Sequence, residues 1–546
     1  MGLRKNEIYR STITDYTTEG SGVCRIDGMA VFVPDSAVGD TADIRILKAA
    51  KNYAYGKIEK IITPSKDRCE PDCDVFRKCG GCTFRHISYE AELAFKQKRV
   101  TDTLTRIGGI PAELVMPIVG AEKINGYRNK AQLPLTVDKE GRICAGFFAA
   151  RSHRVIPLEE CALQSPLFDQ VLKVFLEWAN EEKIPVYDEV RHTGILRHLY
   201  MRHGGKTDEL MVCVVINADS VRGEKRLVEK LCSSFGSLKT VVININKEKT
   251  NVITGKQNRV IYGSGYITDR LCGLEFRISP LSFYQVNRDQ AERLYGIAAE
   301  FAGTNKGETL LDLYCGTGTI GLSMADRAGK LIGVEIIPQA IEDAKLNAQR
   351  NGISNAEFIC ADAARAAHRL SREGIRPDCI IVDPPRKGCD RELISVIEEM
   401  NPKRVVYVSC DPATLARDVK IFGEKGYTVH KAVPVDMFPR TGHVETVVLL
   451  SKGEIDSKKV RVEFSLEDMD MSDFQDKATY TQIKDYVLEH TGLKVSNLYI
   501  SQIKRKCGLE VGKNYNLAKS EDSRQPQCPP EKENAIREAM KYFGMI

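Results

Sequence analysis

The sequence lacks any apolar run long enough to cross a lipid bilayer, so a membrane-spanning helix is not expected. Its first ten residues, MGLRKNEIYR, lack the apolar core of a secretory signal peptide. The sixth residue is Asn6, where a myristoylation signal carries serine or threonine. These absences predict a cytoplasmic protein with no membrane segment.

The sequence also carries little net charge, only +5 over 546 residues. This balance permits a polyanionic partner without requiring one. A hydrophobic share of 42% and a charged share of 28% predict several soluble globular domains. Cysteine, in contrast, is abundant, with 17 residues. In a reducing compartment these thiols are expected to be metal ligands, a nucleophile or buried apolar groups, and not disulfides.

A glycine-rich turn organises the second half of the chain. The predicted strand TLLDLY ends in a turn containing Gly316, Gly318 and Gly321, and a helix is predicted over 320–328. Glycines there let the backbone approach a ligand closely, and a following strand ends in Glu335, which can accept hydrogen bonds from ribose hydroxyls. The pattern predicts a nucleoside cofactor, and by itself it leaves NAD and S-adenosylmethionine open.

Helices and strands alternate beyond this turn, which predicts a Rossmann-like α/β domain with a parallel sheet. Asp362, Asp383 and Cys410 each follow a predicted strand, so they are expected at the edge where such a sheet binds ligands. Asp362 is placed to accept a hydrogen bond from an adenine amino group. Asp383 begins a D-P-P turn, in which the prolines fix the loop.

The first 62 residues predict about five short strands and a small OB-type barrel. The segment TEGSGVCRIDGMAVFVPDSAVGD resembles the TRAM domain, an RNA-binding module, and this resemblance implies RNA contact. Basic side chains also lie close in sequence to Tyr53 and Tyr55, a pattern that fits either RNA binding or a solvated basic edge. These basic residues are Lys48, Lys51, Lys57 and Lys60.

Four cysteines crowd the segment KDRCEPDCDVFRKCGGC, namely Cys69, Cys73, Cys79 and Cys82. Thiolates this close in a cytosolic chain indicate a soft metal or an iron–sulfur cluster, with tetrahedral zinc as the alternative. A further cysteine, Cys161, lies in VIPLEECALQSP. The chemistry alone does not decide whether Cys69 or Cys161 would be the fourth ligand.

Four separated motifs resemble those of the iron–sulfur-containing RNA 5-methyluridine methyltransferases. They are C-x5-C-G-G-C with a distant P-L-x-x-C, SFYQVN at 282–287, S-C-D-P at 409–412 and G-H-V-E at 442–445. The resemblance implies S-adenosylmethionine as cofactor and a 4Fe-4S cluster. It places the cluster on Cys73, Cys79, Cys82 and Cys161, with Cys69 as an extra thiol; a local four-cysteine site remains the alternative.

The resemblance also implies the roles of residues in the catalytic domain. Cys410 would add to C6 of uracil, which makes C5 nucleophilic towards the cofactor's methyl group, and Glu445 would then remove the C5 proton. His443 fits a supporting role better than that of the base. Gln285 would contact the methionine part of the cofactor, and the other expected cofactor-binding residues are Tyr314, Glu335, Asp362 and Asp383.

The resemblance covers residues 8–452 and implies a monomer that methylates a uridine of 23S ribosomal RNA, flipped out of the RNA into the site. A transfer RNA substrate is the nearest alternative. A nucleotide-dependent dehydrogenase and a non-enzymatic RNA-binding module are more distant ones. Basic side chains in the strand-rich central region can hold phosphates, although each one singly is more often a surface charge. They are Arg128, Lys130, Arg151, His153, Arg154, Arg191, His192, Arg197 and His198.

The predicted domains are a barrel over 1–63, a central domain with the iron–sulfur cysteines over 64–270 and the methyltransferase domain over 271–453. A charged linker over 454–473 then leads to a small helical domain over 474–546. Lys504, Arg505 and Lys506 in that last domain suit contact with RNA or the ribosome, and a protein-docking role is equally compatible.

Overall fold

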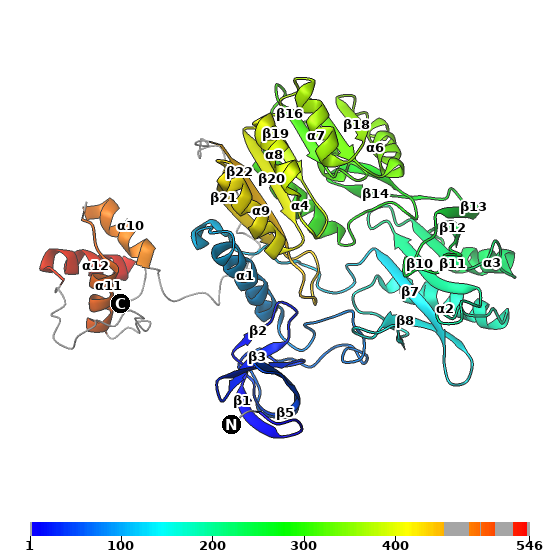
Figure 1. Ribbon diagram of the computed structural model, residues 1–546, viewed down its shortest axis with the longest axis horizontal. Coiled ribbons are helices and arrows are strands. Elements are labelled where there is room, and N and C mark those ends of the chain that lie inside the picture. The colour runs from blue at the N-terminus through cyan, green and yellow to red at the C-terminus, as the bar shows by residue number, and fades with distance from the viewer. Residues whose placement is uncertain (1–2, 453–479, 492, 508–527, 543–546) are drawn as a thin grey trace. The chain divides into compact units, whose positions relative to one another are not determined.

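The computed structural model describes residues 3–452, 480–491, 493–507 and 528–542 (Figure 1). It divides into two compact units, Met1–Arg461 and Val462–Ile546. The predicted linker over 454–473 lies outside the described residues. Within the described ranges, the longest and most apolar helices still fall short of what a membrane span requires.

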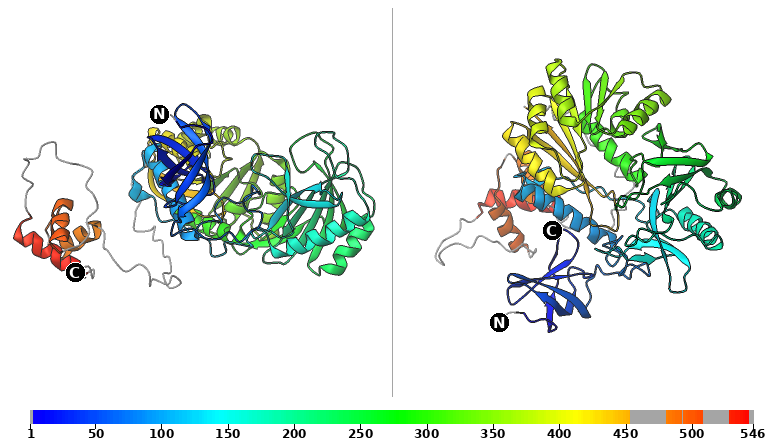
Figure 2. Two further views of the ribbon diagram at one scale, coloured as in Figure 1. Left: turned by 90° about the horizontal axis from the view of Figure 1, so that it is seen from below. Right: turned by 45° about the vertical axis from the view of Figure 1, so that its right-hand side comes forward.

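The N-terminal strands form a six-stranded sheet in the order β1-β5-β6-β4-β3-β2. Alternate side chains, such as Val31, Ile44 and Ile46, enclose a small apolar core. The N-terminal sheet is strongly curled (Figure 2). Strand β1 also contacts β3, where Ser11 Oγ donates to the Arg25 carbonyl at 3.2 Å. The strands are β1 (Ile8–Thr12), β2 (Asp15–Tyr16), β3 (Gly22–Ile26), β4 (Met29–Val33), β5 (Thr41–Ala49) and β6 (Tyr53–Thr63).

The central region holds a seven-stranded sheet in the order β13-β12-β11-β10-β7-β8-β9, antiparallel except between β11 and β12. Helices α2 (Pro166–Glu181) and α3 (Glu224–Ser234) share one apolar cluster with it. Its strands are β7 (Lys130–Val137), β8 (Ile143–Phe148), β9 (Val155–Pro157), β10 (Leu196–His203), β11 (Leu210–Ile216), β12 (Leu238–Ile245) and β13 (Gln257–Gly263). A hairpin of β14 (Ile267–Leu271) and β15 (Leu274–Ile278) follows.

The second seven-stranded sheet has the order β18-β17-β16-β19-β20-β22-β21, and its first five strands are parallel. Strand β22 runs antiparallel to both neighbours. The strands are β16 (Thr309–Leu313), β17 (Lys330–Glu335), β18 (Ala356–Cys360), β19 (Cys379–Val382), β20 (Arg404–Ser409), β21 (Thr428–Val435) and β22 (Glu445–Ser451). The helices are α4 (Arg288–Ala302), α5 (Thr319–Leu322), α6 (Pro338–Arg350), α7 (Ala363–Arg372), α8 (Arg391–Met400) and α9 (Pro412–Glu424).

Consecutive residues of these strands face opposite sides of the second sheet, as strand geometry requires. Leu310 and Ile381 join an apolar cluster with Leu294 of α4. Leu311 and Ile380 join another cluster with α7, α8 and α9. Both faces are therefore covered by helices, which explains why the strands read as nearly continuous apolar runs.

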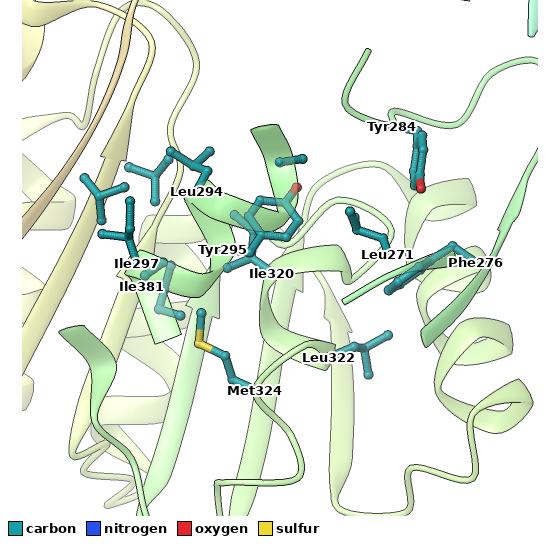
Figure 3. Packing of buried hydrophobic residues seen from close by; sticks show 14 of the residues in the cluster. Leu271, Phe276, Tyr284, Leu294, Tyr295, Ile297, Ile320, Leu322, Met324 and Ile381 are labelled. Atoms are coloured by element: carbon teal, nitrogen blue, oxygen red, sulfur yellow. The ribbon is translucent and has the colours of Figure 1, made fainter. Parts of the chain in front are cut away.

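The core beneath the glycine-rich turn is drawn in Figure 3. Tyr295, Ile320, Leu322 and Met324 pack together there and are almost fully buried. The Tyr295 hydroxyl lies 3.1 Å from Thr319 Oγ1, so α4 is joined to the turn by a hydrogen bond as well as by packing.

The helix predicted over 320–328 is much shorter than expected, because α5 covers only Thr319–Leu322. Ser323 Oγ donates to the Ile320 carbonyl at 2.6 Å. In a longer α-helix this carbonyl would accept the Met324 N–H, which instead bonds three residues back at 3.1 Å. The serine side chain thus competes with the helical hydrogen bond, and the chain continues in turns.

The second unit contains α10 (Tyr480–Thr491), α11 (Asn497–Lys506) and α12 (Pro530–Tyr542). They share a separate apolar core that includes Ile483, Val487, Ile500 and Ile536. The described part of this unit is helical, as the sequence predicts. Its contact with RNA or the ribosome stays a prediction.

A buried ionic network joins α1 (Tyr89–Arg106) to the loop between β21 and β22. Lys96 Nζ donates to Glu92 Oε1 at 2.7 Å and to Asp436 Oδ1 at 2.6 Å, and all three side chains are fully buried. The Tyr89 hydroxyl donates to Asp436 Oδ2 at 2.8 Å. Burial raises the pKa of Glu92 to about 7, while Lys96 opposes this shift.

We predict that Lys96→Met lowers the free energy of unfolding by about 3–5 kcal/mol, because it removes the buried cation that Glu92 and Asp436 share and leaves only Arg440, 3.9 Å from Glu92. Lys98→Met on the same helix is the matched control. Lys98 pairs with Asp15 and Asp102 in solvent, and its loss is expected to cost about 0–1 kcal/mol. Urea unfolding followed by circular dichroism measures both variants. Equal losses of unfolding free energy in the two variants would contradict a stabilising role for the buried ionic network.

Candidate functional site

A cavity of about 840 Å³ opens between the central sheet and the carboxyl ends of the second sheet's strands. This volume lies in the range of ligand pockets. Its lining comes from β7, from segment 283–286, from the glycine-rich turn and from the residues that follow β17, β18, β19 and β20. It includes all the predicted residues of the catalytic domain, namely Gln285, Tyr314, Glu335, Asp362, Asp383, Cys410 and Glu445.

The glycine-rich turn needs left-handed backbone at Tyr314, Gly316 and Gly318, with φ of 71°, 55° and 85°. The value at Tyr314 is unusual for a residue with a side chain and marks local strain. Gly321 meets a different constraint, because a Cβ there would lie 2.8 Å from an oxygen of Asp312. The Gly321 N–H donates to that carboxyl group at 2.9 Å. Burial raises the pKa of Asp312 to about 8.

Glu335 is the last residue of β17, and its carboxylate already holds the turn. One oxygen accepts the Gly316 N–H at 3.2 Å and the other accepts the Ile337 N–H at 3.0 Å. Each carboxylate oxygen can accept a second hydrogen bond, so the group retains capacity for ribose hydroxyls. Asp362 caps α7 through Oδ1, which accepts the N–H groups of Ala364 and Arg365 at 3.1 and 3.2 Å. The expected contact of Asp362 with adenine would therefore use Oδ2.

The segment around Gln285 is fixed from two sides. Asn129 donates its side-chain amide to the Gln285 carbonyl and its backbone N–H to the Val286 carbonyl, both at 2.9 Å. Asn287 caps α4 and donates to the Met437 carbonyl at 3.1 Å. The backbone of Gln285 is thus held between β7 and the β21–β22 loop, while its side chain lines the cavity.

Cys410 and Glu445 are brought together by strand pairing. Ser409 at the end of β20 pairs with Thr446 of β22. Because the two strands are antiparallel, the next position of this register sets Cys410 opposite Glu445. Asp383 follows β19, the neighbour of β20 on its other side.

Cys410 and the two carboxyl groups near it all have raised pKa values. Burial, and next the charges of Glu445 and Asp383, raise the pKa of Cys410 to about 11, while Arg386 favours the thiolate. Burial raises the pKa of Glu445 to about 8 and that of Asp383 to about 7.

His443 also lines the cavity, and burial together with nearby cations lowers its pKa to about 4. The imidazole is therefore neutral at physiological pH. Its ring lies edge-on to Phe438 with centroids 6.2 Å apart. Both side chains come from the β21–β22 loop, which leads directly to Glu445.

Electrostatic interactions link the predicted metal ligands pairwise: Cys79 interacts with Cys73, Cys82 and Cys161, and Cys82 also interacts with Cys161. The Gly81 N–H and the Arg85 Nε–H donate to the sulfurs of Cys79 and Cys82 at 3.4 and 3.3 Å.

Cys69 faces elsewhere, with its thiol 3.6 Å from the Arg85 carbonyl. Over the described ranges, however, no three side chains of His, Cys, Asp or Glu are grouped closely enough to hold a metal ion. In the described part of the chain, Cys79, Cys82 and Cys161 thus lie in one region with Cys73 beside Cys79, and they do not make a formed metal site.

Sequence reasoning did not single out Arg386, whose charge acts on both Cys410 and Glu445. The D-P-P-R motif places it beside Asp383, but nothing in the motif indicates that the guanidinium turns towards Cys410. Phe438 was missed too, because a loop phenylalanine carries no signal of its own. Arg128 and Lys130 were noticed only among many basic residues, and the structure brings these two into the cavity.

Comparison with known proteins gives two matching families. The family described as tRNA (Uracil-5-)-methyltransferase matches residues 220–453, and the TRAM domain matches residues 3–58. The chain is 44% identical over 448 residues to an RNA methyltransferase of Halalkalibacterium halodurans that is named as uncharacterized, with 82% of this chain and 98% of that protein covered. It is 42% identical over 449 residues to one from Clostridium tetani, with 82% and 97% covered.

A solved structure agrees with these matches. The tRNA (uracil-54, C5)-methyltransferase of Pyrococcus abyssi, in complex with S-adenosyl-L-homocysteine, is 30% identical with a TM-score of 0.65. The match covers 81% of this chain and 100% of that chain. The chain therefore belongs to the RNA (uracil-C5)-methyltransferase family, as an S-adenosylmethionine-dependent enzyme with an N-terminal TRAM domain and RNA as its substrate.

Proposed function

We propose that this enzyme methylates C5 of a uridine in 23S ribosomal RNA through a covalent bond between Cys410 and C6 of the base. The observation that carries the proposal is the pairing of β20 with β22, which sets Cys410 opposite Glu445 in the cavity lined by the glycine-rich turn. A dehydrogenase needs neither a thiol nor a carboxyl group in this arrangement.

In the proposed reaction the Cys410 thiolate adds to C6 and the electron pair of the C5–C6 bond becomes available at C5. S-adenosylmethionine supplies an electrophilic methyl group. Once C5 is methylated, Glu445 removes the remaining C5 proton, the double bond re-forms and the Cys410 thiolate leaves. Arg386 favours the anionic forms of both residues, because it lowers the pKa of each.

We assign the cofactor to the glycine-rich turn. Glu335 would bind the ribose through its free lone pairs, Asp362 the adenine amino group through Oδ2, and Gln285 and Asp383 the methionine end. Tyr314 would lie against the cofactor from the strained turn. The position of these side chains around one cavity supports the assignment.

The choice of RNA is proposed from resemblance. The TRAM domain and the cysteine set favour 23S ribosomal RNA by resemblance, whereas the likeness to the Pyrococcus abyssi enzyme favours transfer RNA. The test is methyl transfer from labelled S-adenosylmethionine to purified 23S ribosomal RNA and to transfer RNA, followed by mapping of the modified base. Labelling of transfer RNA alone would overturn the ribosomal assignment.

We also propose that Cys73, Cys79, Cys82 and Cys161 hold a 4Fe-4S cluster with a structural role. The donor chemistry fits, since each of the four thiols interacts with at least one other and N–H donors point at two of the sulfurs, as is common around such clusters. Formation of the cluster would require the sulfurs to draw closer together than they lie in the structure.

We predict opposite outcomes for two variants of the catalytic pair. Cys410→Ala abolishes methylation and forms no protein–RNA adduct. Glu445→Gln slows turnover by about 10²–10⁴-fold and accumulates a methylated adduct that survives denaturation, because the C5 proton stays in place. Gel electrophoresis with labelled cofactor measures the adduct.

Cys360→Ala, at an exposed cysteine next to the predicted adenine site, is the control and is expected to behave as wild type. In the wild type, adduct formation should accelerate as pH rises, since the Cys410 thiol has a raised pKa and must ionise. Normal methylation by Cys410→Ala would disprove the covalent route.

We predict that protein purified without oxygen carries about four irons per chain and a broad visible absorption. Cys161→Ser should lose the iron, whereas Cys69→Ser should keep it, because the Cys69 thiol donates to the Arg85 carbonyl and its pKa is affected by charged side chains other than the four proposed ligands. Elemental analysis and visible spectroscopy measure both. Stoichiometric zinc, or loss of metal from Cys69→Ser, would instead support the local four-cysteine site.

A further inference from the structure

Strand β7 presents a cation to the cavity that no anion neutralises. Lys130 and Gln132 line the cavity, while Ala131 and Leu133 between and beyond them are buried in the core of the central sheet. This alternation is that of a strand with one face in the core. Across the part of the chain that the structure describes, the Lys130 ammonium has neither a hydrogen bond nor an ion pair.

The neighbouring strand β10 places a second positive charge beside Lys130. Lys130 pairs directly with Arg202 of β10. The Arg202 guanidinium donates to the Tyr200 hydroxyl and to the Ser282 carbonyl, and neither acceptor is charged. Like charges opposite each other destabilise a sheet, and burial together with Arg202 and Arg128 lowers the pKa of Lys130 to about 8. An anion in the cavity would remove this penalty.

Two further cations border the same space. Arg128 is fixed by its backbone, which donates to the Leu163 carbonyl at 3.0 Å and accepts from the Ser165 N–H at 3.2 Å. Its Nε is buried without a partner. Arg386 lines the cavity from the turn after β19, and the described residues offer it no ion pair.

Within the described residues, the carboxyl groups that line the cavity form no salt bridge with these cations, although Arg386 lowers the pKa of Glu445. The carboxylate of Glu335 accepts hydrogen bonds from the turn, Asp362 caps α7, and Asp390 caps α8. Burial raises the pKa of Asp383 and Glu445 to about 7 and 8, so at neutral pH both groups carry less negative charge than exposed carboxylates do. The missing anion therefore has to arrive with a ligand.

We propose that Arg128, Lys130 and Arg386 form a phosphate-binding site for the RNA backbone on either side of the flipped uridine. The proposal rests on the proposed function of this cavity. Arg386 acts on Cys410 and Glu445, so the three cations border the place where the uracil must lie. A flipped nucleotide brings two phosphates with it, which matches three cations better than the single carboxylate of the cofactor does.

Such a site would position the nucleotide without reading its sequence, because phosphates carry no base identity. Its signature is the salt dependence of RNA binding, since each neutralised phosphate releases a counterion. Loss of one contact should lower the slope of log affinity against log salt by about 0.7–1.

The test uses the full chain, transcribed 23S ribosomal RNA and three variants. Lys130→Met should weaken RNA binding and lower the salt slope by about 0.7–1, raise KM for RNA, and leave S-adenosylmethionine affinity and kcat within a few-fold of wild type. It should also melt no lower than wild type, because it removes a like-charge pair. Lys130→Arg keeps the charge and should keep the slope. Lys139→Met, in the exposed β7–β8 turn, is the matched control and should change nothing.

Three results would overturn the proposal. An unchanged salt slope in Lys130→Met would show that no phosphate is held there. Weaker S-adenosylmethionine binding with normal RNA binding would identify the cofactor's carboxylate as the anion. A fall in kcat alone would mean that Lys130 acts on the uracil ring. Failure of the wild type to methylate uridine would refute the proposed function instead, and the salt slope would still be measurable.

Discussion

The reversed direction of β22 is the constraint on which the catalytic arrangement depends. In a parallel sheet all strands end at the same edge, so a strand's first residue lies at the far edge from the ligand. Strand β22 is antiparallel to β20, and its first residue, Glu445, therefore arrives at the edge where β20 ends before Cys410. One reversed strand thus supplies a buried carboxyl group beside a thiol without any long loop through the site.

This arrangement requires the β21–β22 loop to be held in place, and distant segments hold it. The N–H groups of Thr83 and Phe84, directly after Cys82, donate to the Arg440 carbonyl at 2.8 and 3.1 Å. Arg99 of α1 donates to the Gly442 carbonyl at 2.6 Å. The cysteine-rich segment is consequently tied to the loop that leads to Glu445. A group bound by the cysteines would therefore influence catalysis through these hydrogen bonds, by helping to hold the loop in place.

The sequence predicted those features that depend on local chain order. The glycine turn, the strand-end positions of Asp383 and Cys410 and the alternation of helices and strands are local patterns, and all of them appear in the structure. The domain boundaries and the roles of the site residues stay predictions. Motifs spread along the chain indicated the family of this protein, and the matches to known families support that assignment.

Other features lay beyond sequence reasoning because they depend on which side chains meet in the fold, in two cases across long stretches of chain. Lys96 and Asp436 are 340 residues apart, and nothing near either one indicates a buried ion pair. The opposition of Lys130 and Arg202 depends on the register of β7 with β10. Helix α5 is short because the Ser323 hydroxyl donates to the Ile320 carbonyl, which in a longer helix would accept a backbone N–H. Periodicity does not report such side-chain competition.

The electrostatics of the cavity also suggest why a charged methyl donor suits this site. Cys410 and Glu445 both have raised pKa values, so each ionises more readily beside a positive charge. In the proposed reaction the sulfonium group is positive when the thiolate must form, and this charge disappears once the methyl group has moved. The pKa of Glu445 then rises again, at the step where it must accept the C5 proton. Before methyl transfer, the positive charge of the donor would favour the Cys410 thiolate. After methyl transfer, the loss of that charge would favour proton uptake by Glu445.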